Sequence, residues 1–472
     1  MKRRRFIRNT GLLSAGLFID QLSFAATADF PVVRVPKAAR KFQSKAVDKA
    51  ITQFRSKVKD PELGWLFENC FPNTLDTTVT FSMKNGRPDT YVITGDIDAM
   101  WLRDSTAQVW PYLSLIKSDK PLQQLIAGVI NRQTECILKD PYANAFYNDE
   151  NKVGEWKSDL TDMKPGIHER KWEIDSLCYP IRLAYHYWKL TGDNAPFDSK
   201  WKNAIASTLK VFIEQQRKTN QGPYKFQRTT AWATDGVPLG GYGYPVKPVG
   251  LICSIFRPSD DATIFPFLIP SNLFAVVSLK QAAMMIKEIS RDEKLAGDLS
   301  ALAQEVDHAI AKYGIINYQD FGKVYAFEVN GFGSFSLMDD ANIPSLLSLP
   351  YLDAVESTDP VYINTRKLVL SENNPFYFKG KAAEGLGSPH TGLDLIWPIG
   401  ITTRGLTSSN DEEIRYCIQT LKSIHGGTGF MHESFHKDDP KKFTRAWFAW
   451  ANTLFGEFLW KTLQEKPHCL QG

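Results

Sequence analysis

Cysteine is scarce in this chain. Only six cysteines occur in 472 residues, and none forms a CxxC pair or a cluster with histidine. This spacing excludes the common structural zinc sites. Most of the six lie inside apolar runs, and we expect them to be buried thiols.

Several catalytic signatures are also missing. The sequence has neither the glycine-rich phosphate loop of nucleotide hydrolases nor a convincing GxSxG turn for a serine nucleophile. The only His/acid-rich stretch is "HESFHKDD", which contains His432 and His436 four residues apart. Its order is H-E-S-F-H rather than HExxH, so we predict no metal site and no cofactor.

Long apolar runs and low-complexity linkers are absent after the first 28 residues. Those residues read as an export signal: "MKRRRFIRN" is basic, a moderately apolar stretch follows, and small residues end it at Ala28. "KRRRFIR" further resembles a twin-arginine leader. We therefore predict a signal peptide over 1–28, one catalytic domain over 29–472, export to the periplasm, and no membrane insertion of the mature chain.

The leader also explains the net charge. It carries five basic residues and one aspartate, a net +4 that equals the net +4 of the whole chain. The mature protein is thus close to neutral, which argues against nucleic-acid partners.

What the chain does contain is helical periodicity. Apolar residues recur at three- and four-residue spacing in many segments. The expected helices are 43–58, 105–117, 121–138, 174–191, 200–218, 271–290, 296–313, 409–424 and 446–464. Short strand-like pieces, "TTVTFSM", "TYVITG" and "KVYAFEVNGFG", look like hairpins added to one end of a helical body.

Acidic or polar clusters repeatedly precede these buried helices. They are "LRDSTAQVW", "EIDSLCYPI", "PSDDATIFPFLIPSN", "MDDANIPSLL", "SPHTGLDLIWPI" and "MHESFHKDDP". Six such clusters with about two helices between them fit an all-α (α/α)6 barrel with its polar clusters at one end. The simpler interpretation is helix capping, for example by Asp104 or Ser105. Capping needs one oxygen, however, and does not explain the accompanying Trp, Arg, His and doubled Asp.

Abundant carboxylates with aromatics and arginine suit glycoside hydrolysis. One carboxylic acid protonates the leaving oxygen, a second carboxylate attacks the sugar or activates water, and aromatic faces stack on sugar rings.

The clusters together are similar to glycoside hydrolase family 125. The resemblance runs from about residue 40 to 465 and includes "TGDIDAMWLRDS", "GLGSPHTG" and "GFMHESFHKDDPKKFTRAWFAWANTLFGE". It implies an (α/α)6 barrel and an exo-α-1,6-mannosidase that inverts the anomeric centre without a metal. The partner would be a mannose-containing oligosaccharide or N-glycan.

The resemblance also implies roles for residues. The general base falls on Glu433, and the general acid on Asp260 or Asp261, of which we favour Asp260. An adjacent carboxylate would raise the pKa of the acid by repulsion. Arg103 and Asp104 resemble the clamp on the terminal mannose.

Other candidates stay open between a role in the site and a structural one. Trp101 is either a wall of the sugar subsite or core, and His390 either binds a hydroxyl or is structural. Asp175 and Asn342 either contact ligand or cap helices. Three more residues flank the presumed catalytic pair: Arg257, Arg445 and Trp447. The glycine-rich segment 240–250 is either a loop over the cleft or a plain connection.

Two alternative functions remain open. One is a non-catalytic glycan-binding barrel. The other is a different helical-barrel glycosidase, such as a calcium-dependent α-1,2-mannosidase.

Overall fold

The computed structural model describes residues 30–471. The chain divides into Met1–Val32 and a compact unit, Val33–Gly472, and the description below concerns the second. The predicted signal peptide and its cleavage point lie outside the described residues. The structure is 47% helical, with short strands, as the sequence periodicity predicts.

Thirteen α-helices are present in the described part of the chain. They are α1 (Lys45–Lys57), α2 (Pro61–Cys70), α3 (Asn73–Thr77), α4 (Leu102–Val109), α5 (Lys120–Lys139), α6 (Ile174–Thr191), α7 (Ser199–Gln215), α8 (Ile269–Met285), α9 (Glu293–Tyr313), α10 (Pro360–Val369), α11 (Pro398–Leu406), α12 (Asp411–Ser423) and α13 (Ala449–Glu465). A 3-10 helix, Trp110–Ser118, follows α4, and a π-helical turn, Ile286–Ser290, extends α8.

The strands form six small sheets of two or three strands within residues 30–471. The antiparallel hairpins are β1 (Val79–Lys84) with β2 (Arg87–Val92), β7 (Ile315–Tyr318) with β8 (Gly322–Tyr325), and β11 (Tyr377–Lys379) with β12 (Glu384–Leu386). The three-stranded sheets are β3 (Met100–Trp101), β4 (Ala145–Phe146) and β5 (Ile167–Glu169); β10 (Phe335–Ser336), β9 (Glu328–Val329) and β6 (Phe267–Leu268); and β13 (Leu395–Ile396), β14 (Ser434–His436) and β15 (Asp439–Thr444).

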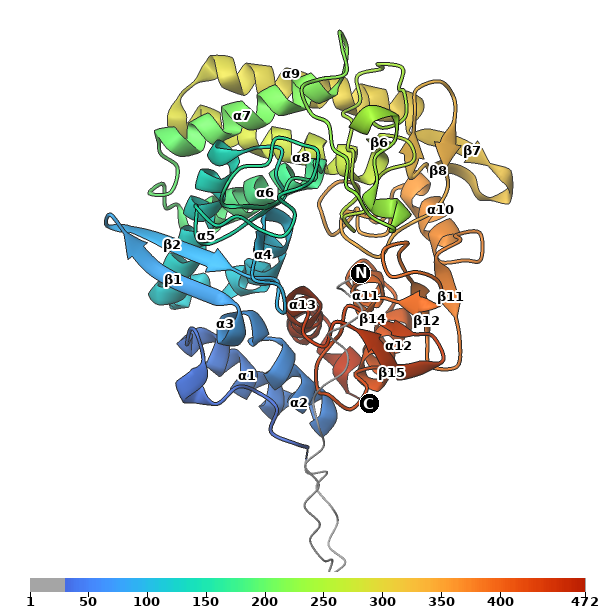
Figure 1. Cartoon of the computed structure of the whole chain (residues 1–472). Helices are drawn as coiled ribbons and strands as arrows, with labels where there is room; N and C mark the ends of the chain where they lie inside the picture. The colour runs from blue at the N-terminus through green and yellow to red at the C-terminus, as the bar shows by residue number, and fades with distance from the viewer. Residues whose placement is uncertain (1–29, 472) are drawn as a thin grey trace, which may run out of the picture. The chain divides into compact units, whose positions relative to one another are not determined.

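Five helices made mostly of buried residues pack side by side in the order α8, α6, α4, α13 and α11. We call them the inner helices. Helices α9, α5, α2 and α12 pack against their outer sides, and α7 packs against α5. In Figure 1, α13 lies toward the middle of the unit, while α7 and α9 run along its upper edge.

The two sets of helices begin differently. Within residues 30–471, seven helices (α1, α2, α5, α7, α9, α10 and α12) have a Ser, Asp or Asn side chain that caps the first turn. At α5, for example, Asp119 Oδ1 accepts the Leu122 N–H at 3.1 Å. The inner helices have no side-chain cap among the described residues; they begin after Trp101, Glu173, Leu268, Trp397 and Phe448. The expectation that Asp104 or Ser105 caps its helix is therefore wrong, because Trp101 occupies the N-cap position.

The sequence pattern missed some elements. It did not indicate α2, α3, α10 or α11, and the single helix expected over 105–117 is α4 followed by the 3-10 helix. Pro111 lies at that junction. Because proline has no N–H to donate, it cannot continue the hydrogen bonding of an α-helix, and α4 ends there. Asn342 caps no helix, because it lies in an irregular segment. There its N–H donates to Asp340 Oδ1 at 3.0 Å.

One helical stretch among the described residues, Ile269–Ser290, is long and apolar enough to cross a membrane, although we expected none. Its mean hydropathy is 1.3, and 83% of that window is buried inside the protein. These properties are those of a core helix, and α8 is the inner helix that contacts both α6 and α9.

Candidate active site

The starts of α4 and α6 bring acidic side chains around one buried arginine. Arg103 Nη1 donates to Glu173 Oε2 at 2.7 Å and to Asp175 Oδ2 at 3.1 Å, and Nη2 donates to Asp260 Oδ1 at 3.3 Å. Its Nε lies 3.5 Å from Asp104 Oδ2. The structure thus joins three of the acidic clusters that the sequence marks. We call these five side chains the Arg103 cluster.

Arg103 is only 3% exposed, and both of its terminal nitrogens are already bonded to carboxylates. The predicted clamp of Arg103 and Asp104 on the terminal mannose stays a prediction. Arg103 holds carboxylates in place, and Asp104 lies beside it. Burial raises the pKa of Asp104 to about 6, and the negative charge of Asp260 adds to the effect.

Asp260 lies in a tight turn with a φ of +67°. The Asp260 N–H donates to Arg257 O at 2.9 Å, and Lys171 Nζ donates to Asp260 O at 2.7 Å. The left-handed backbone costs about 1–2 kcal/mol for a residue with a Cβ. These hydrogen bonds hold the left-handed turn. The Asp260 side chain stays 21% exposed, and its Oδ1 lies 3.4 Å from Asn144 Nδ2.

Asp261 has the opposite environment. Its carboxyl group is fully buried, and Oδ1 lies 3.4 Å from His390 Nδ1. Burial opposes ionisation, but the hydrogen bond and charge of His390 outweigh it and lower the pKa of Asp261. In turn, burial disfavours the charged ring, while Asp261 raises the pKa of His390 to about 9. Asp261 and His390 therefore form a buried ion pair at neutral pH, and an ionised carboxylate is a poor proton donor.

Glu433 lies directly before β14 and is held by Arg445. Arg445 Nη1 donates to Glu433 Oε1 at 3.4 Å, while Nε donates to Asp96 Oδ1 at 2.8 Å and Nη2 to Thr94 Oγ1 at 3.1 Å. The guanidinium also lies over the Phe448 ring, 4.6 Å from its centroid. Arg445 thus fixes one oxygen of Glu433 and ties the loop before α13 to the loop before α4.

The charged side chains around Arg103 and those around Glu433 act on one another. The charges of Glu433, Asp260 and Asp261 all act on His390, and Arg445 acts on Asp104. The structure therefore brings together the predicted acid, base and histidine from segments that are far apart in the sequence.

Most of the other predicted site residues contact groups that support the fold rather than the catalytic candidates. Trp101 is 5% exposed and packs against His168, with ring centroids 5.0 Å apart. The Arg257 side chain pairs with Glu328 at 2.7 Å rather than with the catalytic candidates. Its backbone N–H nevertheless donates to Asp261 O at 2.7 Å, so Arg257 does support the acid turn.

Asn342 is linked to the site only indirectly. Its amide donates to Asp340 Oδ1 at 3.1 Å, and Asp340 Oδ2 accepts the Ser388 hydroxyl at 2.9 Å, two residues before His390. Trp447 is partly exposed, and its indole N–H has no acceptor among residues 30–471. The segment 240–250 is held by several hydrogen bonds to the rest of the unit. Gly241 O accepts the Phe226 N–H at 3.0 Å, and the Lys247 N–H donates to Asn330 O at 2.9 Å. Tyr242 O and Gly250 O accept side-chain donors at 2.9 and 2.7 Å.

Comparisons with known proteins agree with this arrangement. Residues 60–460 match the family model of metal-independent α-mannosidases, glycoside hydrolase family 125. The chain belongs to this family. It is therefore a glycoside hydrolase and an α-mannosidase by family, as the sequence motifs indicate.

Two relatives are similar over nearly the whole chain. A Schizosaccharomyces pombe protein, the meiotically up-regulated gene 157 protein, is 43% identical over 93% of this chain and 90% of its own length. A Streptococcus pneumoniae protein is 42% identical, with a TM-score of 0.86 over 90% of this chain and 100% of its own. It is described as one of a new family of widely distributed metal-independent α-mannosidases, in a non-productive complex with α-1,6-mannobiose.

More distant structures share the fold alone. A bacterial glucoamylase complexed with acarbose is 14% identical, with a TM-score of 0.52 over 79% of this chain and 50% of its own. A GH78 family rhamnosidase of Bacillus sp. GL1 is 11% identical, with a TM-score of 0.52 over 86% of this chain and 35% of its own. The family 125 chain thus has the helical fold of other glycosidases.

The structure adds residues that the sequence did not single out. Glu173 stands in the quoted "EIDS" cluster and bonds Arg103 more closely than Asp175 does. Asn144 and Lys171 hold the side chain and carbonyl of Asp260. The position of Glu173 two residues before Asp175 could have identified it. Asn144 and Lys171 lie in loops without a motif, so the sequence does not mark them.

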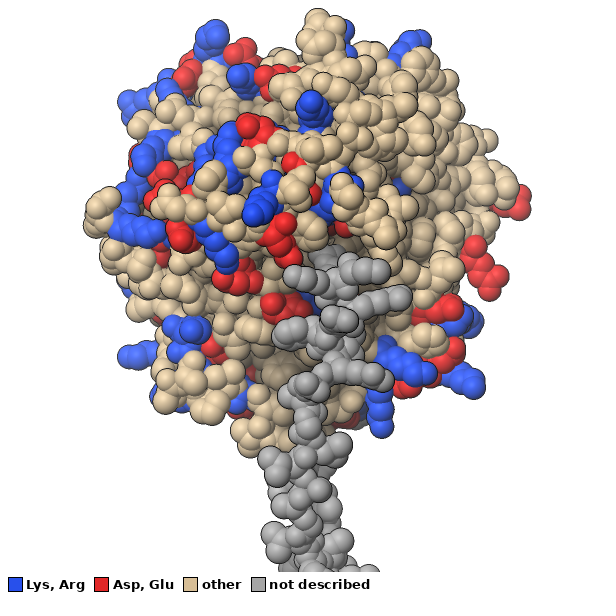
Figure 2. All heavy atoms as spheres, viewed as in Figure 1, with Lys and Arg blue, Asp and Glu red and all other residues tan. Residues whose placement is uncertain are grey.

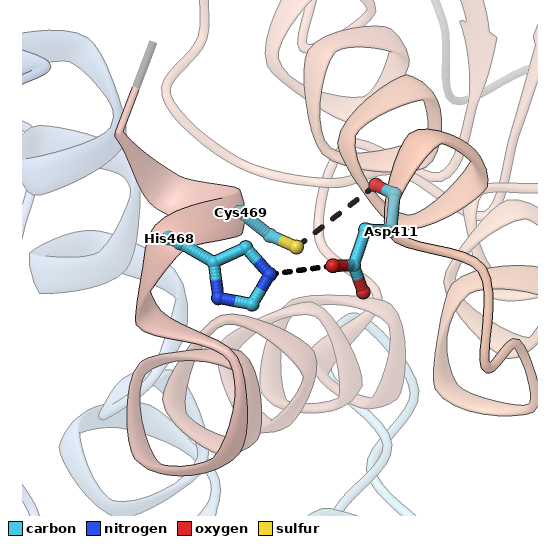
Figure 3. A group of neighbouring side chains, drawn as sticks. All are labelled: Asp411, His468 and Cys469. Carbon is cyan, nitrogen blue, oxygen red and sulfur yellow. Dashed lines mark hydrogen bonds and ion pairs between the residues drawn. The ribbon is translucent and has the colours of Figure 1, made fainter.

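One group of possible metal ligands occurs among the described residues, at Asp411, His468 and Cys469. Figure 3 shows His468 Nε2 bonded to Asp411 Oδ2 at 2.5 Å, and the Cys469 thiol facing the backbone oxygen of Asp411 at 3.9 Å. Lys466 Nζ occupies the other Asp411 oxygen at 2.8 Å. Burial raises the pKa of the Cys469 thiol, which disfavours the thiolate that a metal needs. The group therefore acts as a salt bridge between α12 and the C-terminal residues.

Proposed function

We propose that this family 125 chain is an exo-acting α-1,6-mannosidase that inverts the anomeric centre and uses no metal. One observation carries the linkage: the Streptococcus pneumoniae relative is described in complex with α-1,6-mannobiose. The substrate class would be terminal mannose on oligosaccharides or N-glycans.

The contrast between the two adjacent aspartates supports the roles of the catalytic residues. Asp260 is partly exposed and faces carboxyl neighbours, whereas Asp261 is committed to its ion pair with His390. Asp260 would donate its proton to the leaving oxygen as the C1–O bond breaks. Glu433, oriented by Arg445, would take a proton from the water that attacks C1 from the opposite face. An inverting pair needs roughly 6.5–9.5 Å between carboxyl groups to admit that water.

We also infer that the fold is an (α/α)6 barrel. Each inner helix except α13 is followed in sequence by an outer helix, and five inner helices pack in series. The buried segment from Ala341 to Leu352 would fill the sixth inner position between α8 and α11. Its Ile343 O accepts the Tyr179 hydroxyl of α6 at 2.9 Å, and the Ala341 N–H donates to Gly387 O at 3.1 Å.

The alternatives are less well supported. The calcium-dependent mannosidase disagrees with a family described as metal-independent. A purely glycan-binding barrel would not need both an Arg-oriented Glu433 and a separate, partly exposed Asp260.

The experiment is proton NMR of the mature enzyme with α-1,6-mannobiose in the presence of EDTA. Initial release of β-mannose is expected. Initial α-mannose would refute inversion, and loss of activity with EDTA would refute metal independence. Binding without turnover would favour the glycan-binding protein. The matched variant is Glu433→Gln, for which we expect kcat to fall by ~10²–10⁴.

We further propose export to the periplasm, which rests on the pattern of residues 1–28. The near-neutral charge of the mature chain agrees with a glycan partner rather than nucleic acid. On the face shown in Figure 2, basic and acidic residues are interspersed among the described residues without a large patch of one sign. Mass spectrometry of the secreted form tests the proposal, since it should begin at Asp29.

A further inference from the structure

The Arg103 cluster contains more negative charge than its surroundings can balance. Four carboxyl groups, those of Asp104, Glu173, Asp175 and Asp260, face one guanidinium. With all of them ionised, the cluster would carry a net −3. All of its side chains except Asp260 are at most 7% exposed. Uncompensated buried charge is strongly unfavourable, so such a cluster takes up protons.

Neighbouring cations do not remove this excess. Lys171 Nζ pairs with Asp235 at 2.7 Å and reaches only the backbone oxygen of Asp260. Arg445 acts on Asp104 but is bonded to Glu433 and Asp96. His390 interacts with the charge of Asp260, but its Nδ1 is paired with Asp261 at 3.4 Å.

The contacts of Glu173, like those of Asp175, leave one buried oxygen that can carry a proton. Its Oε2 accepts Arg103 Nη1 and the Ser176 hydroxyl, the latter at 2.8 Å. Its Oε1 is buried and has no donor within residues 30–471. Arg103 also holds Asp260 Oδ1 at 3.3 Å on its other terminal nitrogen, so the Glu173 and Asp260 carboxyl groups meet at one guanidinium. Burial, followed by the charges of Asp260 and Asp175, raises the pKa of Glu173 well above its usual value.

We propose that Glu173 is the positioning residue that keeps the general acid protonated, because Glu173 and Asp260 share a single proton. This inference rests on the proposed function, in which Asp260 is the acid. Two like charges held on one guanidinium do not both ionise easily, so such a pair favours keeping one proton. Arg103 bonds to both carboxyl groups and fixes their separation.

The reaction step balances. The Asp260 O–H bond breaks, its proton passes to the glycosidic oxygen, and that oxygen keeps the electron pair of the C1–O bond. Glu433 takes the proton of the water that bonds to C1. After the products leave, Glu433 releases its proton to solvent and the Glu173–Asp260 pair regains one from solvent.

The test is the pH dependence of kcat/KM in Glu173→Gln, in which the side chain keeps its length and loses its charge. With α-1,6-mannobiose, we expect the basic limb to move to lower pH by about one unit or more, because Asp260 loses its proton more easily. The acidic limb should not move. With dinitrophenyl α-mannoside, whose leaving group needs no proton, kcat/KM should change less than ~3-fold near neutral pH.

The matched control is Asp175→Asn, which removes a buried carboxylate from the same guanidinium. Asp175 is bonded to the same Arg103 nitrogen as Glu173, at 3.1 Å rather than 2.7 Å, and acts on Asp260 through charge. The basic limb of the kcat/KM profile of Asp175→Asn should move by less than half the shift seen in Glu173→Gln. An unshifted limb in Glu173→Gln, equal shifts in both variants, or equal losses with both substrates would overturn the proposal.

If Glu173→Gln does not fold, the wild-type protein decides the matter. With ¹³C-labelled glutamate carboxyl groups, NMR should show one resonance that titrates in two steps, and a single step in Asp260→Asn. A single step in both proteins would overturn the shared proton. Failure of the proposed function looks different, since Asp260→Asn would then hydrolyse α-1,6-mannobiose at the wild-type rate.

Discussion

Replacing Arg103 with methionine tests the electrostatic core of the site. Methionine fills much of the same volume but leaves the neighbouring carboxyl groups without their guanidinium. The three bonds of 2.7, 3.1 and 3.3 Å to Glu173, Asp175 and Asp260 are lost together. Removing one partner of a buried ion pair destabilises a protein by about 3–5 kcal/mol. We therefore expect the free energy of unfolding of Arg103→Met to fall by about that amount near pH 7.

The pH dependence is the sharper part of this prediction. Burial already raises the pKa of Asp104, Glu173 and Asp175 in the native protein, and without Arg103 these values rise further. A carboxyl group with a raised native pKa stabilises the fold below its unfolded pKa and loses that contribution as pH rises through the native pKa. The variant thus binds more protons in its native state than the wild type, and its deficit should grow from pH 5 to pH 8.

The measurement is urea unfolding of both proteins at several pH values. A suitable control is Arg132→Met, because Arg132 makes a two-pronged ion pair with the single carboxylate of Asp89, with Nε at 2.7 Å. Burial opposes ionisation of Asp89, but Arg132 lowers its pKa below 3.8, so this pair is fully formed throughout pH 5–8. We expect the control to lose about 1.5–3 kcal/mol with no trend over that range. A flat deficit for Arg103→Met would refute the idea that Arg103 neutralises several coupled carboxyl groups.

Three further predictions concern single carboxyl groups and His390. Asp260→Asn should lower kcat ~10²–10⁴-fold on α-1,6-mannobiose but far less on dinitrophenyl α-mannoside, whereas Asp261→Asn should impair both, as steady-state kinetics will show. NMR should find a His390 pKa of about 9. The difference in unfolding free energy between wild type and His390→Gln should be largest below pH 6.5 and should decline as pH rises through 9. A difference that does not change with pH would contradict the ion pair. Burial raises the pKa of Asp339 from 3.8 to about 8, so the unfolding free energy of wild type should decline as pH rises through 8, and Asp339→Asn should flatten that decline.

The helical class and most long helices were predictable because they depend on local periodicity. The expected 174–191 is α6 itself, and 121–138 differs from α5 by one residue at each end. Burial of one face selects residues at helical spacing, and that selection is visible in a single sequence. The strand-like pieces "TTVTFSM" and "TYVITG", which were expected to belong to hairpins, overlap β1 and β2, which pair in antiparallel register.

The segment after Asn342 shows where periodicity fails. "NIPSLLSLP" is rich in leucine and buried, but Pro344 and Pro350 interrupt it and no helix is found there until α10 within the described residues. Its Leu346 and Leu347 N–H groups instead donate to the buried Asp339 carboxyl group at 2.8 and 2.9 Å. A leucine-rich run surrounded by prolines is buried without being helical, and composition alone does not separate the two.

The role of Arg103 could not be predicted because it depends on which groups meet across the unit. Arg103, Glu173 and Asp260 are 70 or more residues apart, and each taken alone looks like a cap or a sugar ligand. Only their convergence shows that one arginine serves several carboxyl groups at once.

The acidic clusters before the inner helices are informative because they do not cap them. At α4 and α6 the N-cap positions belong to Trp101 and Glu173, and Asp104 and Asp175 lie inside the first turn. A carboxylate there still benefits from the positive end of the helix without spending its oxygens on backbone amides. The capped helices show the contrary pattern, with Asp119 of α5 bonded directly to the amide of Leu122. At these two helices the signal for a site is therefore an acidic side chain near the helix start that makes no cap bond, at the N-cap itself for Glu173 or inside the first turn for Asp104 and Asp175.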